Sequence, residues 1–138
     1  MFSLVFPGQG SQTIGMGKDF FESYDLVKDL FKQADDSLGA SLSKIILEGP
    51  KDELDLTINT QPAIFLISYS IFQVMKKEFN LDLDNAKYFA GHSLGEYSAL
   101  CAAKYLSFSD TIKLLKTRGE AMQNAVPKGE GGMLAVLG

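Results

Sequence analysis

The sequence predicts an α/β fold built around a parallel β-sheet. Two short apolar runs, residues 3–6 and 88–90, each lead directly into a loop that contains glycines. Much of the remaining chain consists of longer stretches whose apolar residues recur at helical spacing. Strands buried in a parallel sheet are short and continuously apolar, and helices connect them. We therefore expect both runs to be strands of one sheet, with helices packed against it.

The composition is that of one ordinary globular unit: 138 residues, 46% hydrophobic and 22% charged. The net charge of −4 gives no electrostatic support for binding nucleic acid. The most apolar stretch, residues 63–75, is too short to span a membrane. The single cysteine, Cys101, excludes an internal disulfide and suits a reducing compartment. We therefore expect a cytoplasmic protein with no metal site and no nucleic-acid or membrane partner.

The loop at residues 7–12 follows the first predicted strand, and ligands of open α/β sheets bind at this end of the strands. Gly8 and Gly10 would let its backbone approach a ligand closely. These glycines do not fit the dinucleotide-binding pattern G-x-G-x-x-G, because Thr13 stands at the third glycine position. A dinucleotide site is therefore disfavoured.

Periodicity and end signals predict five helices. The most apolar of them begins near Pro62, which suits a first turn, and Asn59 or Thr60 can cap it. Its apolar residues lie on nearly all sides, so we expect it at the centre of the core. The acidic segment 49–56 is interpreted as solvated surface. The predicted helices span residues 25–38, 41–47, 62–79, a stretch from the second strand to about residue 105, and 108–126.

The last predicted helix carries a clear apolar stripe. Ser107 and Asp110 form a capping-box variant at its start, and Pro127 ends it. Residues 133–137 resemble a new strand. Because an unpaired apolar strand is an edge liability, we interpret the sequence as truncated. The stripe consists of Phe108, Ile112, Leu115, Gly119, Met122 and Val126.

The stretch Gly91-His92-Ser93-Leu94-Gly95 stands between the second strand and its helix. In that setting G-x-S-x-G is typical of a nucleophile elbow, a sharp turn that exposes a serine hydroxyl. The serine takes a strained backbone conformation, and both flanking glycines must lack a Cβ for the chains to pass. We therefore predict Ser93 as a nucleophile supported by Gly91 and Gly95. The alternative is a glycine-rich turn whose serine only caps the helix.

A serine nucleophile needs a general base and donors for the oxyanion. His92 is the only histidine, and as the neighbour of Ser93 it points away from the hydroxyl. We interpret it as a packed or hydrogen-bonded structural residue, so the base is missing from this sequence. The N–H of Leu94 is the first expected oxyanion donor. Gln9 in the loop at residues 7–12 is a candidate for the second, with a plain glycine turn as the alternative.

Arg118 lies beside the apolar stripe of the last predicted helix. An arginine in this position can extend its charged head to water. It can also present a planar fork to a carboxylate in a cleft. Position alone leaves both interpretations open.

Five segments carry a resemblance to a known family: residues 6–12 (FPGQGSQ), 60–63 (TQPA), 91–100 (GHSLGEYSAL), 117–123 (TRGEAMQ) and 132–138 (GMLAVLG). Together they resemble the malonyl-CoA:acyl-carrier-protein transacylases, the acyltransferases of fatty acid and polyketide synthesis. The segments follow the family's order and extend over the whole chain. The first and third are highly specific in combination.

The resemblance implies a role for each candidate residue. Ser93 would carry the acyl group, and Gln9 and Leu94 would supply the oxyanion-hole N–H groups. Arg118 would pair with the free carboxylate of a malonyl group, and Gln61 would lie near the pocket. Family members are considerably longer, and their catalytic histidine lies downstream of the residues present here.

The resemblance also implies an architecture and an activity. Residues 1–126 would be the N-terminal part of an α/β hydrolase-like subdomain, and residues 127–138 the start of a ferredoxin-like subdomain. A malonyl group would pass from malonyl-CoA through a malonyl-serine to the phosphopantetheine thiol of acyl carrier protein. The expected partners are acyl carrier protein and the coenzyme A thioester, with no permanently bound cofactor.

Two other functions stay open at this point. A serine esterase or hydrolase of the α/β type has the same elbow, but gives no reason for Arg118 or for the loop around Gln9. A non-catalytic fragment that binds coenzyme A or a carrier protein agrees with the missing base.

Overall fold

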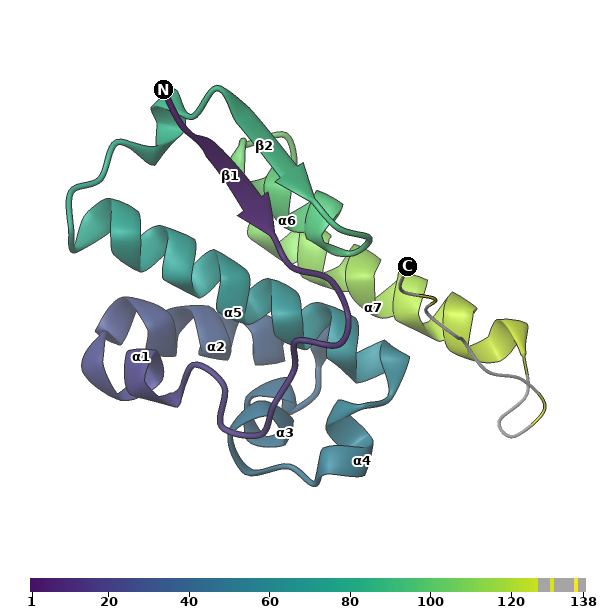
Figure 1. Ribbon diagram of the computed structural model, residues 1–138. Helices are drawn as coiled ribbons and strands as arrows, with labels where there is room; N and C mark the ends of the chain where they lie inside the picture. The colour runs from purple at the N-terminus through teal and green to yellow at the C-terminus, as the bar shows by residue number, and fades with distance from the viewer. Residues whose placement is uncertain (127–129, 131–135, 137–138) are drawn as a thin grey trace.

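A computed structural model describes residues 1–126, 130 and 136, and it has two strands in parallel (Figure 1). Strand β1 (Ser3–Phe6) pairs with β2 (Tyr88–Gly91), and Ser3 stands opposite Tyr88. Both predicted strands and their parallel pairing are confirmed. The fold is therefore α/β, with a small sheet and mostly helices. The predicted strand at residues 133–137 and the predicted small subdomain at residues 127–138 lie outside the described residues, apart from two positions.

The helices carry most of the chain. All five predicted helices are present, and two short ones, α1 and α4, are additional. Helix α1 escaped prediction because six residues are too few to show a helical period, although Phe20 and Phe21 pack partly buried against the core. Helix α4 lies in the acidic segment, yet Leu54 within it is fully buried. The helices are α1 (Lys18–Ser23), α2 (Asp25–Leu38), α3 (Leu42–Glu48), α4 (Lys51–Leu54), α5 (Thr57–Lys77), α6 (Gly95–Ala102) and α7 (Phe108–Ala125), with a 3-10 turn η1 (Leu83–Asn85) before β2.

The start of α5 corrects one prediction. The helix begins at Thr57, before the two residues expected to cap it. Thr60 Oγ1 donates to the carbonyls of Leu54, at 2.5 Å, and Leu56, and Asn59 Nδ2 donates to the carbonyl of Glu53 at 2.9 Å. Both side chains therefore fasten α5 to the end of α4 from inside the helix. As predicted, this part of α5 is buried on all sides, from Asn59 to Leu66.

Helices α5 and α7 pack against each other along the centre of the molecule. A Cβ on Gly119 would lie 2.7 Å from the Ile58 Cα and from the Thr57 carbonyl oxygen, so the two helices touch at backbone level there. The predicted stripe of α7 is buried from Phe108 to Gly119, and its cap is present, with Asp110 N–H donating to Ser107 Oγ. Farther along α7, Met122 and Val126 are exposed instead.

The sheet is covered less completely than predicted. Helix α6 packs against both strands (Figure 1). Phe6 lies among Phe72 of α5 and Ala99 and Ala102 of α6. Of β1, however, only Phe6 is buried, and Val5 is 75% exposed. The expectation of a buried strand was wrong for this part of the protein, because a sheet of two strands leaves an open edge on each.

Within the described residues, none of the helices has both the length and the apolar character that a membrane span requires.

Candidate active site

Ser93 lies at the sharp turn between β2 and α6. Its φ is 54°, a left-handed conformation that residues other than glycine rarely adopt. The carbonyl of Ser93 accepts from Glu96 N–H, and that of His92 accepts from Gly95 N–H, so the first turn of α6 forms directly behind the serine. The hydroxyl itself is on an exposed residue. The backbone therefore has the strand–turn–helix form expected for a nucleophile elbow.

Close backbone contacts account for the two flanking glycines. A Cβ on Gly91 would lie 1.9 Å from the carbonyl carbon of Gly95. A Cβ on Gly95 would lie 2.4 Å from the carbonyl oxygen of Phe6, at the end of the neighbouring strand. No side chain fits at either position without moving the backbone. The elbow is thus packed between the end of β1 and the start of α6.

The two candidate oxyanion donors lie at the ends of adjacent strands. Leu94 has a fully buried side chain and precedes α6, while Gln9 is in the exposed loop after β1. The Gln9 amide donates to Thr57 Oγ1 at 3.4 Å. Among the hydrogen bonds of the described residues, none is donated by the backbone N–H of Gln9 or Leu94. Neither N–H group is therefore engaged by another described residue.

His92, interpreted from the sequence as a packed or hydrogen-bonded structural residue, is an exposed residue next to Ser93. Its backbone N–H donates to the Phe6 carbonyl at 3.1 Å. A Cβ on Gly8 would lie 2.4 Å from the imidazole Nδ1, so the ring rests directly on the loop that carries Gln9. Within the described part of the chain, no hydrogen bond joins this ring to Ser93. The contacts of His92 are with the loop after β1.

Arg118 connects the elbow to the core. Its Nη2 donates to Ser93 Oγ at 3.2 Å, and its Nη1 donates to Gln61 Oε1 at 2.7 Å. The guanidinium carbon stands 5.8 Å from the centre of the Tyr97 ring, a cation–π distance. The residue is only half-buried, but its head points to the serine and not to open water. Of the two interpretations left open for Arg118, the geometry favours the one that aims at a site.

Gln61 reaches the same cluster from α5. It is fully buried, and besides accepting from Arg118 it donates from Nε2 to Met122 Sδ at 3.2 Å. The structure thus brings together Ser93, Arg118 and Gln61 from the elbow, α7 and α5.

Tyr97 and Met122 were not predicted as site residues, and Met122 was named only as part of the apolar stripe. Each follows a predicted site residue by four positions on a helix or its first turn, and that spacing puts it on the same face. The signal was therefore present in the sequence. To use this signal, however, one must know that α6 and α7 turn these faces toward the same site.

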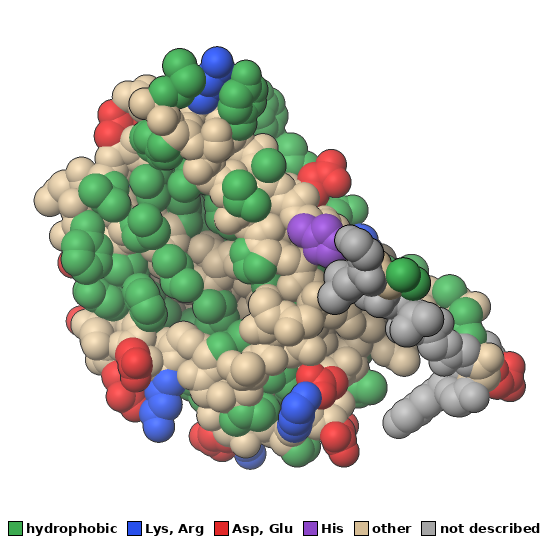
Figure 2. All heavy atoms as spheres, viewed as in Figure 1, with side chains coloured by type: hydrophobic (Ala, Val, Ile, Leu, Met, Phe, Trp, Pro, Cys, Tyr) green, Lys and Arg blue, Asp and Glu red, His purple; other side chains and the backbone are tan. Residues whose placement is uncertain are grey.

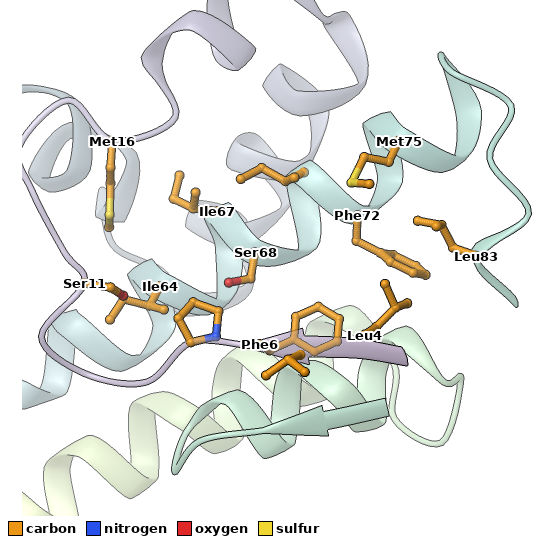
Figure 3. A pocket seen from close by; sticks show the side chains of 13 residues that line it. Leu4, Phe6, Ser11, Met16, Ile64, Ile67, Ser68, Phe72, Met75 and Leu83 are labelled. Carbon is orange, nitrogen blue, oxygen red and sulfur yellow. The ribbon is translucent and has the colours of Figure 1, made fainter. Parts of the chain in front are cut away.

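A separate apolar pocket of about 310 Å³ lies between β1 and α5, away from Ser93 (Figure 3). Phe6 and Leu4 point from the strand toward Phe72 and Ser68 of the helix, and Figure 2 shows apolar side chains gathered on this side of the molecule. The described lining includes no titratable group, and its polar side chains are Ser11 and Ser68. This pocket offers apolar contact and no acid–base chemistry.

Comparisons with known proteins agree with this geometry. The sequence matches the family model of the acyl transferase domain over residues 3–137. The malonyl CoA-acyl carrier protein transacylase of Haemophilus influenzae is 49% identical over 137 residues, which are 99% of this chain and 43% of that protein. The crystal structure of the acyl-carrier-protein-S-malonyltransferase from Bartonella henselae superposes with a TM-score of 0.86 at 49% identity, covering 92% of this chain and 41% of the other.

A third similar protein was solved with a partner. It is a malonyl-transacylase in complex with a type II PKS acyl-carrier protein, with a TM-score of 0.83, 42% identity, and coverage of 93% of this chain and 40% of that one. This chain therefore spans less than half the length of these relatives and matches their N-terminal portion. The family model, the sequence relatives and the structural relatives all indicate the same class of protein. The chain belongs to the acyl transferase family.

Proposed function

We propose that this chain forms the nucleophile-bearing part of an enzyme that transfers a malonyl group from malonyl-CoA to acyl carrier protein. The observation that carries the proposal is the contact between Arg118 and Ser93, at 3.2 Å. Arg118 is the only arginine of the chain, and its position lets one residue bind a carboxylate next to the nucleophile. The names of the relatives support both the donor and the acceptor.

The first half-reaction would form an ester on Ser93. Its Oγ attacks the thioester carbonyl of malonyl-CoA and loses its proton to a general base. The oxyanion of the tetrahedral intermediate accepts from the N–H groups of Gln9 and Leu94. The carbon–sulfur bond then breaks, and the coenzyme A thiolate takes up the proton as it leaves. Throughout, Arg118 holds the distal carboxylate, which the ester carbonyl and one methylene separate from Oγ.

The second half-reaction would reverse these steps with a different thiol. The phosphopantetheine thiol of acyl carrier protein gives its proton to the base and attacks the ester. The carrier thioester forms, and the Ser93 hydroxyl is restored with that proton. We propose that the base lies outside these 138 residues, because the chain has one histidine and its ring rests on Gly8.

The same proposal extends to the architecture. We infer that residues 1–126 belong to an α/β hydrolase-like subdomain, since the elbow joins a parallel strand to a helix in the way that fold requires. A ferredoxin-like subdomain beginning near residue 127 and a location in the cytoplasm stay predictions from the sequence.

Intact-mass spectrometry tests the proposal directly. The full-length protein is incubated briefly with malonyl-CoA, and the expected product is a single malonyl adduct that peptide mapping places on Ser93. Ser93→Ala should give no adduct, because Ser93 is the proposed nucleophile and its hydroxyl is then absent. Addition of holo acyl carrier protein should move the malonyl group to the carrier.

The other outcomes identify the competing functions. Steady release of malonate without a carrier product would indicate a hydrolase. Retained coenzyme A binding without acylation of Ser93 would indicate a binding protein. Either result overturns the proposal.

A further inference from the structure

The amide of Gln61 has a fixed orientation. Its side chain is fully buried in the contact between α5 and α7. Because a guanidinium has only donors, the oxygen of the amide must face Arg118 Nη1, which it meets at 2.7 Å. The nitrogen is then directed to Met122 Sδ at 3.2 Å, where a thioether is a weak acceptor. Both ends of the amide are therefore used, and the polar group is satisfied in the core.

The partners of Arg118 are all uncharged. They are the Gln61 carbonyl oxygen, the Ser93 hydroxyl and the face of the Tyr97 ring. The salt bridges among the described residues all use lysine, and none involves this guanidinium. Withdrawing a charge from water without a partner of opposite charge is costly, and the cost grows with burial. The protein thus orients a cation here without neutralising it.

The backbone contact of α5 with α7 brings the two side chains together. Gly119 follows Arg118 directly, and a Cβ there would lie 2.7 Å from the Thr57 carbonyl oxygen. On the same faces, Lys116 Nζ donates to Asn59 Oδ1 at 3.2 Å. The spacing between the helices is therefore fixed one turn from Gln61. A buried amide on α5 can then reach a guanidinium on α7 with little freedom of its own.

We propose that Gln61 is a positioning residue that holds Arg118 in place through a neutral oxygen, and so determines the preference for acyl groups with a free carboxylate. With Nη1 occupied by the amide, the remaining edge of the guanidinium, Nη2 and Nε, is left for a bidentate carboxylate. A glutamate at position 61 would keep the shape of the side chain and the oxygen that accepts from Arg118. It would also add a negative charge, which in the wild type only the carboxylate of the substrate supplies. This inference rests on the proposed malonyl transfer.

Gln61→Glu tests the inference in the full-length enzyme. With malonyl-CoA, we expect kcat/KM to fall on the order of a hundredfold, mainly through a higher KM, because the introduced side-chain carboxylate competes with that of the substrate. With acetyl-CoA, kcat/KM should stay within about threefold of the wild type or rise. Gln73→Glu introduces the same charge on α5 away from Arg118. It should leave kcat/KM for both malonyl-CoA and acetyl-CoA unchanged.

A second variant covers the case that Gln61→Glu does not fold. Gln61→Met fills the same space beside Met122 but gives Arg118 no acceptor. It should raise KM for malonyl-CoA about tenfold and leave acetyl transfer unchanged, because only the orientation of the guanidinium is lost. In an Arg118→Ala background, Gln61→Glu should cause no further loss of malonyl transfer.

Opposite results overturn the inference. Parallel losses for both acyl groups, or an undiminished malonyl preference in Gln61→Glu, would mean that Gln61 only fills the core. If the wild-type enzyme transfers no malonyl group, the proposed function itself has failed. The wild-type assay therefore separates the two failures.

Discussion

Ser93 combines a reactive side chain with an unfavourable backbone. A residue with a Cβ costs about 1–2 kcal/mol in the left-handed region, and Ser93 has a φ of 54°. Strain of this kind persists only where the surroundings hold it in place. Here the backbone of Gly91 packs closely on that of Gly95, and the backbone of Gly95 on that of Phe6, which holds the turn in this conformation. The left-handed conformation of Ser93 therefore lowers the stability of the fold, and it leaves the serine exposed at the turn.

This strain predicts opposite effects of glycine at two serines. Ser93→Gly should be about 1 kcal/mol more stable than Ser93→Ala, because both lose the contact with Arg118 but only glycine accepts this φ without a Cβ penalty. At Ser109 in the first turn of α7, Gly should instead be less stable than Ala by roughly 0.5–1 kcal/mol. Chemical denaturation of the four variants measures both differences. Equal stability of the two Ser93 variants would show that the turn is unstrained.

The charge of Arg118 predicts substrate selectivity. Arg118→Ala should lower malonyl transfer by on the order of a hundredfold and leave acetyl transfer nearly unchanged, because an acetyl group has no carboxylate for the guanidinium. Lys113→Ala, on the exposed side of the same helix, serves as the control for lost positive charge. Steady-state kinetics with malonyl-CoA and with acetyl-CoA measures both effects. An equal loss for the two substrates would remove the argument for selectivity.

Local patterns sufficed to predict some site residues but not their partners. Ser93 and its two glycines form a pattern within five residues, so the sequence alone located the turn. The bond from Arg118 to Gln61 crosses 57 residues. Helix periodicity placed Arg118 beside a buried stripe, but it contains no information about which helix packs opposite. The contacts of this arginine therefore stayed unknown until the packing of α5 and α7 was known, and its role in binding a carboxylate stays a prediction.

At the scale of elements, a helix end was predicted correctly where a residue beside it in the sequence caps or terminates the helix. Ser107 caps α7 through Asp110, and Gly39 ends α2 with a φ of 61°. The start of α5 failed for the opposite reason, because Thr60 uses its hydroxyl to bind the carbonyl of Leu54 in the preceding element. A capping residue and an anchoring residue have the same side chain. Only tertiary structure distinguishes them.

Asp84 in η1 joins three elements through two lysines. Lys104 Nζ and Lys76 Nζ donate to its carboxylate at 2.6 and 2.7 Å, from the turn after α6 and the end of α5. These hydrogen bonds, that of Lys104 first, lower the pKa of Asp84 below its ordinary 3.8. The carboxylate form is therefore favoured more strongly in the folded state than in the unfolded chain.

Asp84→Asn should consequently reduce stability at neutral pH only slightly, by roughly 0.5 kcal/mol, because the groups are solvated. A lowered pKa stabilises the fold above the unfolded value, and this contribution is lost as the pH falls through the folded pKa. The difference in Tm from the wild type should thus be constant above about pH 5, begin to shrink near 3.8, and vanish only once the pH lies below the lowered pKa of the folded state. Thermal unfolding across this range measures it, with Glu120→Gln as the control. A difference that persists in acid would rule out the ion pair as its cause.

Over the described molecule, helices form most of the core, and the candidate site lies where the end of β2 meets helices α5, α6 and α7. The larger buried cluster draws on α2, α3, α5 and α7, whereas the smaller one beneath the strands has five members. A pair of strands is only marginally stable by itself, so the elbow depends on the helices behind it. The sequence predicted this α/β class from its apolar runs. It did not predict that Val5 would be exposed, because an apolar run gives no information about how many neighbours a strand has.

The contact between Arg118 and Ser93 has a consequence for the resting protein. A hydroxyl that accepts a hydrogen bond from a cation holds its lone pair more tightly and attacks carbonyls less readily. A carboxylate bound at Nη2 and Nε would neutralise the cation and so weaken its bond to Ser93 Oγ. The arriving acyl group would then unmask the nucleophile that it acylates.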